Sequence, residues 1–238
     1  MTAQLPKTTA PRSAPAWWQR PWIGPLLLVV AAFLGFSVPR YLTFDPALSQ
    51  LEVPEGDAVY YPILVAHVLF GAVAMVASCF QIWPRFRRRH WRGHKITGRI
   101  YVFGGVLPAG VLGLYIGWNT PFGPSVRVAN LLIAVLWITV TVIALRMARR
   151  RRVADHRKWM IRSFALTMSI IMSRVINVPA IITLAGQTDT AFGGSETLML
   201  QTATSIGVWL SLVVSLLLAE WGVERQSRFT TGRSPSSG

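Results

Sequence analysis

Long apolar stretches alternate with short polar segments along the 238 residues of this chain. Each stretch is close to the about 20 residues that a helix needs to cross a hydrocarbon layer of about 30 Å. The apolar positions are continuous rather than alternating, so the pattern favours helices over the strands of a barrel. It predicts an all-α, polytopic membrane protein with about six transmembrane helices in a bundle. The predicted spans are residues 22–38, 60–83, 100–116, 126–145, 159–184 and 198–219.

The two ends of the chain differ from this apolar body. Residues 1–20 are rich in Pro, Thr, Ser and Ala, and we expect them and residues 223–238 to be disordered tails on a transmembrane domain of residues 21–222. A basic tail before an apolar run also resembles a secretory signal peptide. The run ends in Ser37-Val38-Pro39-Arg40, without a small-residue cleavage pattern. We therefore interpret residues 22–38 as an uncleaved anchor.

Composition supports a membrane location. Hydrophobic residues make up 52% of the chain and charged residues 14%, whereas soluble domains carry about 25% charged residues. The formal charge of +15 could indicate a nucleic-acid partner. However, 21 of the 24 Lys and Arg fall in four clusters separated by apolar stretches, whereas a nucleic-acid groove mixes basic and aromatic residues across one fold. We therefore expect no nucleic-acid partner.

The basic clusters instead predict the orientation in the membrane. With the N-terminus inside, cytoplasmic segments collect 21 basic residues and external segments two, as the positive-inside rule requires. The prediction is a protein of the cytoplasmic (inner) membrane with both termini in the cytoplasm. Its basic loops would also contact anionic lipid head groups.

Recognisable catalytic chemistry is lacking in the sequence. The single cysteine, Cys79, allows no disulfide or cysteine metal cluster. No hydrolase triad, P-loop, dinucleotide fingerprint or metalloprotease helix appears. We therefore predict no catalytic residue, no metal and no required cofactor.

Glycines mark the third span. Gly113 and Gly117 form a G-x-x-x-G pair, and small residues four apart let helix backbones approach closely. The pair predicts either packing within the bundle or a homodimer contact.

Polar residues inside the spans suggest a binding site. His67 lies in the second span and Arg174 in the fifth, and a charged residue within the bilayer usually faces the bundle interior or a cavity. Thr167, Arg174 and Asn177 share a polar stripe. We hypothesise that these residues and His67 form an outward-opening pocket that binds or transports a small molecule or anion. The alternative is a buried polar network that fixes helix register.

Two segments at the predicted cytoplasmic ends of the third and fifth spans resemble each other. His94 parallels His156 at an offset of 62, and Arg99 parallels Arg162 at 63. Such matches suggest two related helical hairpins, or a chance match among apolar sequences. Topology places both histidines at one depth. They are either interfacial residues that meet lipid phosphates with the neighbouring arginines or axial ligands of a b-type haem. A metal site without carboxylate or thiolate partners is a weaker alternative.

The same segments carry a family resemblance. Together with the earlier His67, the patterns H-[KR]-x-x-G-R-x-Y from His94 and H-R-x-W-M-x-R-S from His156 resemble bacterial multi-spanning membrane proteins of domain-of-unknown-function family 2306. The resemblance covers roughly residues 60–185. It implies a membrane location and no established activity.

Overall fold

The computed structural model describes residues 23–49 and 56–231, and no strand occurs among them. Five helical segments are long and apolar enough to cross a membrane, which confirms an all-α polytopic membrane protein. These segments are α3 (Tyr60–Ile82), the continuous unit of α5 (Trp91–Tyr101), η3 (Val102–Val106) and α6 (Leu107–Trp118), α7 (Gly123–Arg149), α8 (Val153–Ala185) and α10 (Glu196–Thr231).

The first predicted span appears as a shorter helix, α1 (Ile23–Ser37), of 15 residues. At 1.5 Å per residue it is about 22 Å long, less than the about 30 Å of a hydrocarbon layer. Its buried Val30 packs against Met75 and Cys79 of α3. The helix is therefore part of the bundle, although it is shorter than the other five segments.

Most helices extend past the predicted spans. The third begins at Trp91 rather than at residue 100, and α10 continues to Thr231, through residues 223–231 that were predicted to be tail. The physical reason is that hydropathy marks only the stretch that lipid can cover, while Arg, Lys and Glu outside it still favour helix. The other tail predictions, residues 1–20 and 232–238, lie outside the described residues.

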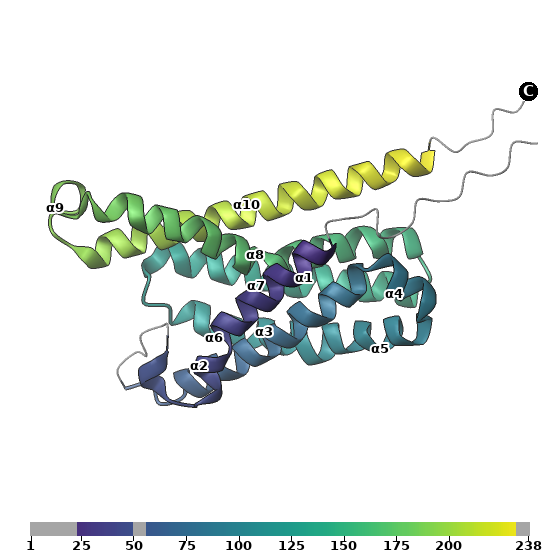
Figure 1. The fold of residues 1–238 in the computed structure, drawn as a ribbon, viewed down its shortest axis with the longest axis horizontal. Helices are drawn as coiled ribbons and strands as arrows, with labels where there is room; N and C mark the ends of the chain where they lie inside the picture. Colours follow the sequence, from purple (N-terminus) through teal and green to yellow (C-terminus); the bar gives the residue numbers. More distant parts are fainter. Residues whose placement is uncertain (1–22, 50–55, 232–238) are drawn as a thin grey trace, which may run out of the picture.

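The long helices lie side by side along the long axis of the molecule (Figure 1). One end carries α4 (Pro84–Arg89) and the turn between α7 and α8, which are rich in arginine, and we call it the basic end. The opposite end carries α2 (Pro39–Leu42), η2 (Pro46–Leu48) and α9 (Thr188–Ala191), and we call it the acidic end. There α8 and α10 form a long pair that extends beyond the other helices (Figure 1).

The unit of α5, η3 and α6 contains a π-helical segment, Val102–Val106. Pro108 lacks a backbone N–H and cannot bond the carbonyl four residues before it. The N–H of Leu107 bonds the carbonyl of Val102, five residues back. This wider turn carries the helix past the proline without ending it, as π-bulges do.

Glycines along η3 and α6 contact two different helices, α3 and α7. A Cβ on Gly105 would lie 2.8 Å from Cα of Ala74 in α3, and one on Gly117 would lie 3.1 Å from Cβ of Asn130 in α7. Positions four apart advance by about 40° around a helix, so these glycines face α3 first and α7 later. Gly113 and Gly117 therefore lie at helix contacts within one chain, and the homodimer through them stays a prediction.

Candidate functional site

Helices α5 and α8 run in the same direction and are held in register by a buried hydrogen bond. The Tyr101 hydroxyl lies 2.6 Å from Oγ of Ser163, and both side chains are fully buried. Each residue follows a histidine by seven positions, which is two helical turns along the same face. The register therefore places His94 and His156 at one depth, at the basic end.

Each of these histidines has a distinct environment. Nδ1 of His156 lies 2.8 Å from the Ala144 carbonyl of α7. Because a carbonyl only accepts, this nitrogen carries the proton, and the Nε2 lone pair of the neutral ring remains available. The His94 ring stacks on Trp91 and interacts electrostatically with His156 and Arg87. Its buried Nδ1 has no hydrogen-bond partner in the described structure. The two imidazoles lie at one depth on helices in register, and we call them the histidine pair.

Arg99 and Arg162 are the two arginines predicted at the cytoplasmic ends of the third and fifth spans, and Arg162 is paired with a residue of another helix. Nε and Nη2 of Arg162 donate to the two carboxylate oxygens of Glu220 in α10, at 2.7 and 2.9 Å, and the guanidinium lies over the Trp159 ring. Arg99 is exposed at the basic end. Arg162 therefore joins α8 to α10, whereas Arg99, five residues after His94, lies about 140° around α5 from that histidine.

A hydroxyl network lies two turns deeper than the histidines. Besides Tyr101, Ser163 contacts the Thr141 hydroxyl at 2.6 Å. The Thr167 hydroxyl lies 2.8 Å from the Tyr101 oxygen and accepts a hydrogen bond from Nε1 of Trp137 at 3.0 Å. Thr167, predicted to line an outward-opening pocket, therefore belongs to a network that joins α5, α7 and α8.

The remaining pocket residues face different neighbours. Nδ1 of His67 lies 2.8 Å from the Ala109 carbonyl of α6. Asn177 packs against α10, where a Cβ on Gly207 would lie 2.7 Å from the Asn177 Oδ1. Arg174 is exposed on α8.

No hydrogen bond in the described part of the chain joins His67 to Thr167, Arg174 or Asn177. Met168 and Ile171 of α8 pack in one cluster with Met75 of α3, and both His67 and Arg174 lie beyond this contact toward the acidic end. The pocket predicted around these residues therefore stays a prediction.

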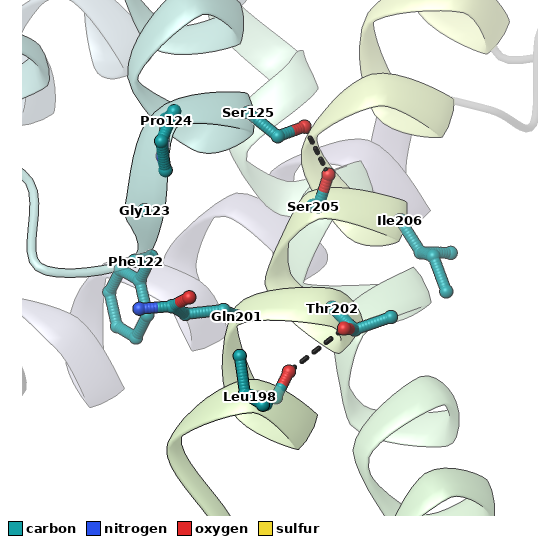
Figure 2. A pocket seen from close by; sticks show the side chains of 9 residues that line it. All are labelled: Phe122, Gly123, Pro124, Ser125, Leu198, Gln201, Thr202, Ser205 and Ile206. Atoms are coloured by element: carbon teal, nitrogen blue, oxygen red, sulfur yellow. Dashed lines mark hydrogen bonds between the residues drawn. The ribbon is translucent and has the colours of Figure 1, made fainter. Parts of the chain in front are cut away.

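The sequence pattern did not indicate a cavity of about 270 Å³ between the first turns of α7 and α10. The Ser125 and Ser205 hydroxyls lie 2.6 Å apart, and Nε2 of Gln201 donates to the Pro121 carbonyl at 3.3 Å. Figure 2 shows these polar groups on facing helices, and none of the lining residues is charged. Its polar residues lie about 80 positions apart in the chain, so only the tertiary structure reveals it. The complete lining is Phe122, Gly123, Pro124, Ser125, Leu198, Gln201, Thr202, Ser205 and Ile206.

The fold and the histidine pair define a class, a polytopic α-helical membrane protein with two imidazoles at its basic end. The particular family follows from comparison with known proteins. Residues 64–223, about two thirds of the chain, match the family described as predicted membrane protein (DUF2306). The chain belongs to this family, as the two histidine-centred motifs predicted. No curated protein and no solved structure matches the chain.

Proposed function

We propose that this chain is a membrane redox protein that holds a b-type haem between His94 and His156 at its basic end. The observation that supports this best is the register of α5 and α8, in which Tyr101 lies 2.6 Å from Ser163 and each of these residues follows its histidine by seven positions. The alternative pocket has less support, because no hydrogen bond among the described residues joins His67 to Arg174, Asn177 or Thr167. Bound haem would supply one-electron transfer.

The number of ligands favours haem over a metal ion. Among the described residues, no group of three or more His, Cys, Asp or Glu could hold a metal, and protein zinc sites use three or four such ligands. Haem iron takes its axial ligands from one or two side chains, and bundles provide them from facing helices. Two histidines therefore suit haem and leave a bare metal ion underligated.

The side chains around the pair fit such a group. The hydrogen bond from Nδ1 of His156 to the Ala144 carbonyl sets the ring orientation and leaves the Nε2 lone pair free to ligate, as in many ligating histidines. The orphaned Nδ1 of His94 is a buried polar atom that a bound group or its water could satisfy.

The hydroxyl network would act as the rigid base of this site. Tyr101, Ser163 and Thr141 join α5, α7 and α8 two turns beneath the imidazoles. Because their hydrogen bonds cross three helices, they limit rotation of the helices that carry the two ligands. The positive-inside rule predicts that the pair lies near the cytoplasmic surface of the membrane.

A visible spectrum of the full chain, purified in detergent and titrated with haemin, tests the proposal. We expect a Soret band at one haem per chain, lost in His94→Ala and in His156→Ala. His90→Ala is the matched control, because His90 is an exposed histidine at the same end, and it should keep the band. A protein that stays colourless and does not take up haemin would rule the proposal out, as would unchanged haem binding in both single variants.

A further inference from the structure

His67 is a histidine within a membrane span that the proposed haem site does not use. Its Nδ1 lies 2.8 Å from the Ala109 carbonyl, so this nitrogen carries the proton and donates it. In the neutral ring, Nε2 then presents a lone pair. No described residue donates to that atom. The bundle therefore holds a hydrogen-bond acceptor with a defined tautomer and no partner for it in the described structure.

Helix α6 leaves room for the His67 imidazole because it carries a glycine, Gly113, opposite the ring. A Cβ on Gly113 would lie 3.1 Å from Cε1 and 3.3 Å from Nδ1 of His67. With alanine at this position, the ring would have to shift by a few tenths of an ångström. Gly113 therefore lets the ring lie against α6 in the orientation that the hydrogen bond requires.

A second polar side chain reaches α6 on the next turn. Gly117 lies one turn beyond Gly113, about 6 Å along the axis, and its Cβ position is 3.1 Å from Cβ of Asn130 in α7. The Asn130 amide makes no hydrogen bond to another described residue. His67 from α3 and Asn130 from α7 thus approach consecutive turns of one helix.

The chemistry of these two groups defines what they could bind. The Nε2 lone pair accepts a hydrogen bond, and the amide can both donate and accept. Neither group is charged in this form, and placing a charged ligand at this depth without an opposite charge is costly. We propose that His67 and Asn130 bind an uncharged, lipid-soluble molecule of the hydroquinone class, whose hydroxyl donates to Nε2 of His67. This site is separate from the haem site, and each can fail without the other.

Nuclear magnetic resonance of the full chain in lipid nanodiscs, with ¹⁵N in the histidine rings, tests this site directly. The probe is tetramethylhydroquinone under reducing conditions, and its dimethyl ether is the control ligand without donors. We expect one unprotonated ring nitrogen to shift on addition of the hydroquinone and not of the ether. That signal should be absent in His67→Gln and unchanged in His90→Gln.

Asn130→Leu provides a second variant that leaves the histidine in place. Losing one hydrogen bond to the ligand should weaken the affinity about tenfold, measured by the concentration that gives half of the shift. A shift of equal size with the dimethyl ether, no shift at saturating hydroquinone, or a shift that persists in His67→Gln would overturn the proposal. None of these outcomes depends on whether haem is bound.

Discussion

The orientation of single polar side chains decides what this protein can bind. His67 and His156 both donate from Nδ1 to the carbonyl of an alanine in a neighbouring helix, 42 and 12 residues away in the chain. This bond sets the tautomer and leaves Nε2 for another partner. His94 has no such acceptor in the described structure. Three histidines that look similar in the sequence therefore differ in what they offer a ligand.

At the same scale, the Tyr101 hydroxyl should contribute measurably to stability. Tyr101→Phe removes the partner that Ser163 and Thr167 share in a fully buried site. We expect the free energy of unfolding to fall by about 1–3 kcal/mol, the range for leaving buried polar groups unsatisfied. Denaturant titration in mixed micelles, followed by circular dichroism, measures this change. Phe103→Leu, at an exposed position in η3, should have little effect, and an equal loss in both variants would contradict the assignment.

Helix contacts in this bundle depend on small residues placed on the correct face. Along η3 and α6, Gly105 touches α3 and Gly117 touches α7, because positions four apart drift around the helix. The π-helical turn before Pro108 keeps these residues in one continuous element. The glycine pattern was visible in the sequence, whereas the helix that each glycine meets was not. Which helix a given glycine contacts depends on how α6 is rotated about its own axis.

Two adjacent glycines allow a matched test at the scale of the element. A Cβ at Gly105 would lie 2.8 Å from both Cα and Cβ of Ala74, whereas one at Gly104 meets nothing closer than Ile100 at 3.8 Å. Gly105→Ala should destabilise the protein by about 1–3 kcal/mol through overpacking. Gly104→Ala should be neutral or slightly stabilising, because alanine favours helix. Thermal unfolding in detergent compares the two, and the opposite order would show that α3 and η3 pack differently.

For the whole molecule, charge and length determine how the bundle lies in the membrane. Arginine-rich turns gather at one end, and Asp45, Asp57 and Asp189 lie at the other, beside η2, α3 and α9. This asymmetry predicts that the basic end faces the cytoplasm. Whether the short α1 crosses the membrane determines whether Ile23, its first residue, lies on the same side as the end of α10. Haem at His94 and His156 would then be near the cytoplasmic surface, and the His67 site in the outer half.

Cysteine labelling can test this layout, because Cys79 is the only native cysteine and is buried. In a Cys79→Ala background, Thr190→Cys at the acidic end should react with a membrane-impermeant maleimide on intact cells. Arg88→Cys at the basic end should react only after the cells are permeabilised. The reverse labelling pattern would invert the orientation of both proposed sites. Unlabelled Thr190→Cys in both conditions would instead indicate that the α8–α10 tip is immersed in lipid.

The sequence by itself determined the all-α membrane class, the position of the five long helices, the two charged ends and the family. These follow from transfer free energies and charge counts, which each segment carries independently of its neighbours. Only the tertiary structure decided that Tyr101 contacts Ser163 across α5 and α8, that Thr167 joins the Tyr101 network, and that His67 meets the Ala109 carbonyl. The physical reason is that polar partners depend on the rotation and depth of each helix, which packing between distant segments controls.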